Sequence, residues 1–165
     1  MVSIAFGIHV RVLVAAIAAV LFALAVPSFG AAQTALIGSW QLNLAKSHFS
    51  PGPPFRSLTI TYDAIGQGMR NSFNGIDADG KSLHGTFTVI EDGKYHPVTG
   101  VPDYDESAYK RIDANTLDNT RMKAGRVVQS GRRMLSPDGR TLTFTQTGVN
   151  ANGQQINDIL VYDKQ

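Results

Sequence analysis

Apolar and polar residues alternate along most of the chain after residue 36. Leu58, Ile60 and Tyr62 are separated by threonines, and Leu142 and Phe144 lie among three more threonines. A period of two indicates a half-buried strand, because successive side chains of a strand point to opposite faces. No convincing helical period is present after the N-terminal segment. The pattern predicts about ten strands, at residues 37–45, 57–63, 68–75, 82–90, 94–98, 105–112, 116–122, 126–135, 140–148 and 155–163.

Short turn signals separate these strands. Asp79-Gly80, Asp92-Gly93, Asp138-Gly139 and Asn152-Gly153 all provide residues that tolerate positive φ. Their regular recurrence predicts an antiparallel meander in which each strand pairs with the next. A sheet of eight to ten such strands either closes on itself or splits into two packed sheets. Sequential hairpins favour an all-β, closed up-and-down barrel, which at this strand number has room for one small ligand.

Two segments repeat one another, GIDADGK at 75–81 and GVNANGQ at 148–154. Their spacing of acidic and amide residues invites a calcium interpretation. An EF-hand loop needs an oxygen ligand at its first position and a glutamate at its twelfth. Those positions hold glycine first and Thr86 or Ile159 twelfth. We therefore interpret both segments as turns that end on a glycine.

The N-terminal segment differs from the rest of the chain. Residues 12–26 contain no polar side chain, Arg11 precedes them, and small residues follow at 30–32. This order is typical of a secretory signal peptide, and the run is shorter than the roughly 20 residues of a membrane span. We predict a signal peptide at 1–32 and a single barrel domain at 33–165. The protein is then exported to a bacterial periplasm or secreted, with no membrane span after cleavage; an uncleaved anchor is the alternative.

Composition excludes several function classes. The net charge is only +2, which does not suit nucleic-acid binding. There is no cysteine, so neither disulfides nor thiolate metal sites can form. His48, His84 and His96 lack the short spacing of metal ligands, and no hydrolase motif is present. We expect no metal, no cofactor and no catalytic residues.

The two ends of the predicted domain carry a resemblance. The opening LIGSWQLNLAKSHF resembles the first strand of the calycins, the lipocalin and fatty-acid-binding-protein barrels, which carry an early Gly-x-Trp. The ending VYDKQ resembles the last strand of the intracellular fatty-acid-binding group. The opening is also similar to the start of small exported bacterial proteins of unassigned function. The resemblance implies a barrel with an internal ligand cavity, in which Gly38 and Trp40 form a structural plug at one end.

The chain departs from that resemblance in two places. A proline-rich segment at 46–57 occupies the place of a helix-turn-helix lid, and it could fold over the barrel mouth. Fatty-acid-binding proteins carry Arg-x-Tyr on the last strand to hold a carboxylate. Tyr162 matches that tyrosine, but Leu160 occupies the position of the arginine.

Arginines near the end of the chain offer another charge for a ligand. Arg132 and Arg133 are adjacent, so one of them should face inward, where a buried arginine needs a partner. It could stack on Trp40, as an arginine does in lipocalins, or bind an anionic group. The alternative is that the basic residues of 121–133 are the solvated faces of one hairpin. Candidate ligand-binding residues are Tyr62, Asn71, Phe73, Phe87, Arg121, Arg132, Arg133, Phe144 and Tyr162.

Our leading hypothesis is a non-enzymatic, monomeric, lipocalin-like protein. Its partner would be a small, largely apolar or amphipathic molecule bound inside the barrel. The second hypothesis is an envelope structural, interaction or inhibitor module with a filled core. The third is an enzyme on a calycin-like barrel, for which the sequence offers no nucleophile-base or metal constellation.

Overall fold

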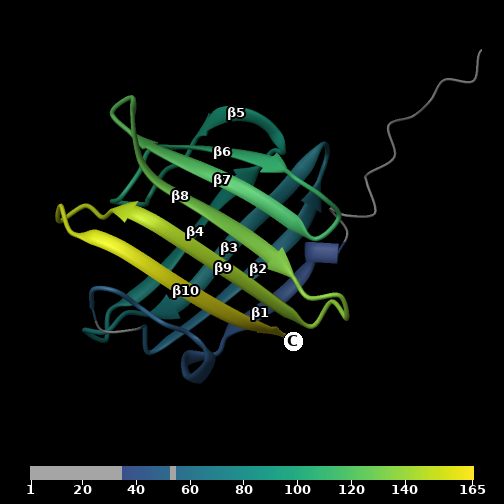
Figure 1. Cartoon of the computed structure of the whole chain (residues 1–165), viewed down its shortest axis with the longest axis horizontal. Coiled ribbons are helices and arrows are strands. Elements are labelled where there is room, and N and C mark those ends of the chain that lie inside the picture. The colour runs from purple at the N-terminus through teal and green to yellow at the C-terminus, as the bar shows by residue number, and fades with distance from the viewer. Residues whose placement is uncertain (1–34, 53–54) are drawn as a thin grey trace, which may run out of the picture.

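The computed structural model of the 165-residue chain describes residues 35–52 and 55–165. The predicted signal peptide and its cleavage site lie outside the described residues. Within the described part the protein is an antiparallel β-barrel (Figure 1).

All ten predicted strands are present, with bounds that differ from the predicted ones by a few residues at most. A short 3₁₀ turn, η1 (Leu44–Lys46), follows the first strand. The strands are β1 (Gly38–Leu42), β2 (Ser57–Ile65), β3 (Gly68–Ile76), β4 (Ser82–Val89), β5 (Asp92–Pro97), β6 (Glu106–Arg111), β7 (Thr116–Lys123), β8 (Arg126–Leu135), β9 (Thr141–Val149) and β10 (Gln155–Lys164).

The strand order is β4-β3-β2-β1-β10-β9-β8-β7-β6-β5, and every neighbouring pair is antiparallel. Because β1 pairs with both β2 and β10, the two ends of the sequence meet and the sheet rolls up. The barrel is nearly closed. β4 and β5 stand at opposite ends of the order and do not pair. The predicted meander is therefore wrong at this one step, and Asp92-Gly93 lies within β5 instead of forming a hairpin turn.

One end of the barrel is sealed by apolar side chains. Trp40 is completely buried, and its indole Nε1 donates a hydrogen bond to the Leu36 carbonyl at 2.9 Å. Met69 and Leu142 are equally inaccessible to solvent. The cation over the Trp40 ring is Lys164, whose Nζ lies 5.0 Å from the ring centroid. The arginine that we expected as one alternative at this place lies elsewhere, and Trp40 packs at the closed end away from the cavity described below.

The connections that follow the odd-numbered strands all lie at the opposite end, because adjacent strands are antiparallel. The two repeated segments form the expected turns there. The backbone N–H of Gly80 donates to the Asp77 carbonyl at 3.1 Å, and that of Gly153 donates to the Asn150 carbonyl at 3.0 Å. Residues 43–52 and 55–56, together with the β5–β6 connection at 98–105, complete the rim of this open end.

Candidate ligand-binding cavity

A cavity of about 460 Å³ occupies the open half of the barrel. Most of its wall is apolar, with Leu58, Ile60, Phe87 and Leu160 among the residues that line it. Phe55, from the proline-rich segment, lines it as well. The volume falls within the usual range for small-molecule sites in proteins. The remaining lining residues are Tyr62, Asn71, Phe73, Ser82, Leu83, His84, Gly100, Val101, Pro102, Asp103, Tyr104, Arg121, Arg133, Leu142, Phe144, Gln146 and Tyr162.

Arg133 points into this cavity from β8 and is only 6% exposed. Its Nε donates to the Tyr62 hydroxyl at 3.1 Å, and its Nη1 donates to Asn119 Oδ1 at 2.7 Å. The guanidinium carbon lies 4.1 Å from the centroid of the Phe144 ring. Arginine stays charged in proteins, so a full positive charge is buried here with neutral partners only.

Arg121 enters the same cavity from β7 and is 7% exposed. Its Nη1 donates to Gln129 Oε1 at 2.7 Å and to Gln146 Oε1 at 3.1 Å. Its guanidinium carbon also lies 4.4 Å from the centroid of the Tyr104 ring, a cation–π distance. Both glutamine amides point their other end toward the rim, where Gln146 Nε2 donates to Asp158 Oδ2 at 3.0 Å. Arg121 therefore meets carboxylates only through intervening amides.

Gly131 creates the space that brings the two arginines to one aromatic ring. It lies on the inner face of β8, opposite Asn119 on β7 and Gln146 on β9. A Cβ at this position would lie 2.5 Å from a carbon of the Phe144 ring and 2.8 Å from the Thr145 carbonyl oxygen. The ring can therefore lie against the strand. The guanidinium carbon of Arg121 is 5.3 Å from the Phe144 centroid.

The phenols around the arginines are uncharged. Burial raises the pKa of Tyr62, and the nearby positive charge of Arg133 only partly opposes that effect. Burial likewise raises the pKa of Tyr104 and of Tyr162. Among the described residues, no carboxylate contacts the guanidinium of Arg121 or Arg133. The polar part of the cavity therefore carries a positive charge at neutral pH.

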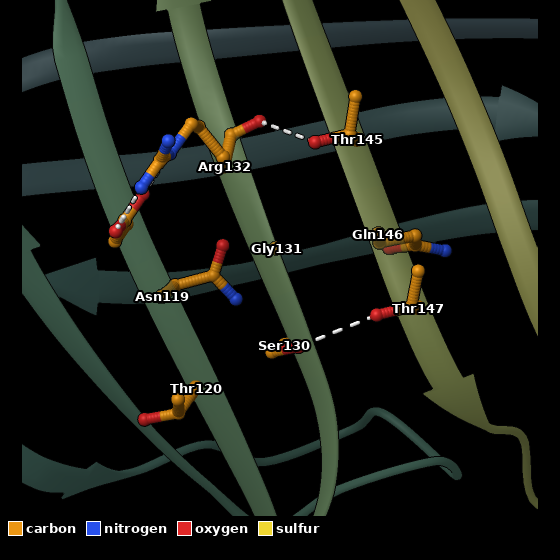
Figure 2. A pocket seen from close by; sticks show the side chains of 9 residues that line it. Asn119, Thr120, Ser130, Gly131, Arg132, Thr145, Gln146 and Thr147 are labelled. Carbon is orange, nitrogen blue, oxygen red and sulfur yellow. Dashed lines mark hydrogen bonds and ion pairs between the residues drawn. The ribbon is translucent and has the colours of Figure 1, made fainter.

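The structure corrects the prediction for Arg132. This residue lies on the outer face of β8, where its Nε and Nη2 donate to the two carboxylate oxygens of Asp118 at 2.6 and 2.8 Å. Figure 2 shows it beside Thr145, in a groove outside the barrel that Ser130 and Thr147 also line. The register of β8 with β7 places Arg132 opposite Asp118 and Arg133 opposite Leu117, which fixes their opposite directions.

The other eight candidate residues all line the cavity, and sequence reasoning missed some of their neighbours. Gln146 has the strand parity of Phe144 on β9, and Gln129 has that of Arg133 on β8. This parity was the sequence signal that could have placed both glutamines on the inner face. Tyr104 lies in a connection, where no strand period fixes its direction.

Across residues 35–52 and 55–165 there is no cluster of three or more histidine, aspartate or glutamate side chains that could hold a metal. In that same part of the chain no helix has the length and apolar character of a membrane span.

The strand order, the roll of β1 onto β10 and the interior cavity together decide the architecture. The fold is a calycin-like barrel. A zebrafish ileal bile acid-binding protein complexed with cholic acid is 14% identical over 79% of this calycin-like chain and 99% of its own, with a TM-score of 0.45. As-p18, an extracellular fatty acid binding protein, is 13% identical over 79% of this chain and 96% of its own, with a TM-score of 0.47.

No protein-family profile matches the sequence. No curated protein matches it either.

Proposed function

We propose that this chain is an exported, non-enzymatic protein that binds one small amphipathic molecule in the barrel cavity. The apolar body of the ligand would lie against side chains such as Ile60 and Phe87. Its anionic group would face Arg133 and Arg121. The observation that carries the proposal is a largely apolar cavity holding two buried guanidinium groups, which no carboxylate of the described residues contacts.

The charge of Arg133 argues for an amphipathic ligand over a purely apolar one. Burying an ionised group without an opposite charge is costly, and its neutral partners Tyr62 and Asn119 offset only part of that cost. A ligand carboxylate or similar group would provide the missing charge and strong, charge-assisted hydrogen bonds. A hydrocarbon would provide neither, so it would leave the guanidinium uncompensated.

The cavity volume supports this proposal over the filled-core interaction module. An enzyme would need reacting groups that contact one another. His84 and Asp103 both line the cavity, but no hydrogen bond joins them among the described residues. A binding role therefore uses the groups that are present, whereas a catalytic role would need others.

Calorimetric titration with dodecanoate tests the proposed function, with Arg133→Gln as the variant and Arg132→Gln as the matched control. We expect saturable binding at one ligand per chain, and an affinity about tenfold or more weaker in Arg133→Gln, because hydrogen bonds to a charged group contribute about 1.5–3 kcal/mol. Arg132→Gln should bind like the wild type. Heat is a better observable than Trp40 fluorescence, since Trp40 does not line the cavity. Absence of saturable binding to the wild type contradicts the proposal.

Export is tested separately on the N-terminal segment. The short apolar run at 12–26 and the small residues at 30–32 support signal cleavage after Ala32. Mass spectrometry of the intact protein secreted by a bacterial host should give a chain beginning at Gln33. A chain that keeps residues 1–32 in the membrane fraction would support the uncleaved anchor instead.

A further inference from the structure

We propose that the ligand's head group is dianionic, a phosphate monoester or a group of the same charge on an apolar chain. This inference rests on the proposed function, because it names the chemistry of the group that meets the two buried arginines. It follows from the charge of the cavity, from the convergence of the guanidinium groups and from a surplus of buried donors beside them.

Charge is the first observation. Arg121 and Arg133 are both more than nine-tenths buried. Their hydrogen-bond partners are all neutral side chains, namely Tyr62, Asn119, Gln129 and Gln146. A ligand with one negative charge would compensate one guanidinium and leave the other buried without a counter-charge, which is unfavourable.

The rim carboxylates do not replace that counter-charge. Asp158 accepts from the backbone N–H of Ser50 at 2.9 Å, and Asp103 accepts from that of Ala151 at 2.8 Å. Each reaches Arg121 only through a glutamine amide, and the Gln129–Asp103 contact is long at 3.5 Å. No described hydrogen bond leads from either aspartate to Arg133. These acids hold the rim segments in place and leave the deeper charge uncompensated.

Convergence is the second observation. Arg121 and Arg133 stand on neighbouring strands with the inner-facing Gly131 between them. Both guanidinium carbons lie over the same Phe144 ring, at 5.3 and 4.1 Å from its centroid. Both residues also line the same cavity, so a single compact head group bound there can face both charges. A molecule with two widely separated acids is not needed.

Unused hydrogen-bond donors are the third observation. Ser107 and Tyr109 on β6 lie opposite Arg121 and Asn119 on β7, and all four residues are at least nine-tenths buried. Within residues 35–52 and 55–165, no hydrogen-bond partner is found for Ser107 Oγ, the Tyr109 hydroxyl, Asn119 Nδ2 or Arg121 Nε. All four groups can donate a hydrogen bond, and two of them cannot accept one. Of these four residues only Arg121 lines the cavity, and the other three lie beside the two guanidinium groups. Unused donors around the charges favour a head group that is rich in acceptors, and a phosphate offers three strong acceptor oxygens.

Three ligands that share a dodecyl chain but differ in their head group test the head-group charge directly. Dodecyl phosphate, dodecyl sulfate and dodecanoate are titrated into the wild-type protein by calorimetry, below their micelle concentrations, at pH 7.5 and pH 5. Sulfate has the tetrahedral shape of phosphate but a single charge. Phosphate carries nearly two charges above its second pKa of about 6 and one charge below it. We expect dodecyl phosphate to bind at least about tenfold more tightly than dodecyl sulfate at pH 7.5, and about equally at pH 5.

The same ligand series controls for pH effects that come from the protein's own titratable groups. The titratable groups that face the two arginines or line the cavity are Tyr62, Tyr104, Tyr109, Tyr162, Asp103, Asp158 and His84. Any pH effect that they cause acts on dodecyl sulfate as well. Only the difference in affinity between dodecyl phosphate and dodecyl sulfate therefore reports the charge of the head group.

Variants assign the effect to the arginine pair. The phosphate advantage is the tighter binding of dodecyl phosphate relative to dodecyl sulfate at pH 7.5. We expect most of it to be lost in Arg121→Gln and in Arg133→Gln, and to be kept in the outer-face variant Arg132→Gln. Equal affinity for all three ligands at pH 7.5 overturns the dianion inference and leaves the proposed binding function intact. Binding of none of them, with correctly folded protein, overturns the proposed function itself. A phosphate advantage that persists in both cavity variants also overturns the inference.

Discussion

The two halves of the barrel are built from the same strands but have opposite chemistry. β7 carries Leu117 at the closed end and Arg121 in the open half, and β9 carries Leu142 and then Gln146 in the same order. The closed end is dry and apolar around Trp40. The open half buries two charges and their amide partners beside a cavity of about 460 Å³.

This difference separates stability from binding. Full burial of large apolar side chains makes the closed end the main source of stability, because the free energy gained grows with the apolar area removed from water. The open half gives up some of that gain, since a void and uncompensated charges are both unfavourable. Substitutions in the two halves should therefore change different measured quantities.

The largest effect is expected for Trp40→Ala at the closed end. Loss of a fully buried aromatic ring should lower the free energy of unfolding by about 3–5 kcal/mol. Urea denaturation followed by far-UV circular dichroism measures it. Trp40→Phe, which keeps a ring, should lose less. A loss below about 1 kcal/mol for Trp40→Ala would show that the closed end is not the stabilising region.

The next effect is expected for Gly131→Ala at the border of the cavity. The added Cβ would press on the Phe144 ring and on the Thr145 carbonyl, so the free energy of unfolding should fall by about 1–3 kcal/mol. Dodecanoate affinity should fall as well, because the Phe144 ring on which both arginines stack must move. Ser130→Ala, its exposed neighbour on the outer face, is the control. Equal stability of the two variants would contradict the packing at Gly131.

Arg133→Met should change stability and binding in opposite directions. Removal of the buried charge should raise the free energy of unfolding of the empty protein by about 1 kcal/mol, even though Asn119 loses its donor. Calorimetric titration should show that ligand affinity falls at the same time. Denaturation of Arg132→Met provides the comparison. If Arg133→Met is strongly destabilised, the buried charge holds the fold together instead of being kept for a ligand.

The smallest effect is expected for Asp118→Asn on the outer face. The hydrogen bond from Arg132 lowers the pKa of the Asp118 carboxyl below its ordinary value. The stability that this pair contributes is therefore present above the ordinary pKa of an aspartate and is lost as the pH falls through the lowered value. Because exposed ion pairs contribute little, denaturation of wild type and variant should nearly coincide at pH 7, and ligand binding should be unchanged. Weaker binding in this variant would indicate that the outer groove takes part in recognition.

The sequence predicted the strands well, because alternation such as Leu58-Thr59-Ile60 is set by burial on one face. It did not predict the gap between β4 and β5. The Asp92-Gly93 pair is chemically suited to a hairpin, and only the long-range closure of the barrel decides that it is not one. The sequence also left Arg132 and Arg133 unresolved, since the two neighbours differ only in strand register. The register is set by pairing with Leu117 and Asp118 on the next strand.

Part of the candidate site was beyond the reach of strand patterns. Gln129 and Gln146 lie on inner positions, but amides on a strand ordinarily indicate a solvated face. They are inside because Arg121 needs acceptors there. The direction of Tyr104 depends on how its connection folds over the guanidinium, which no local pattern encodes.

Native mass spectrometry of the protein purified from cells that produce it naturally tests the central claim most directly. We expect one small amphipathic anion bound per chain, present in the wild type and in Arg132→Gln and absent or strongly depleted in Arg133→Gln. A wild-type protein that carries no such molecule, or an equal amount of it in Arg133→Gln, would contradict the claim that the buried arginines hold the ligand.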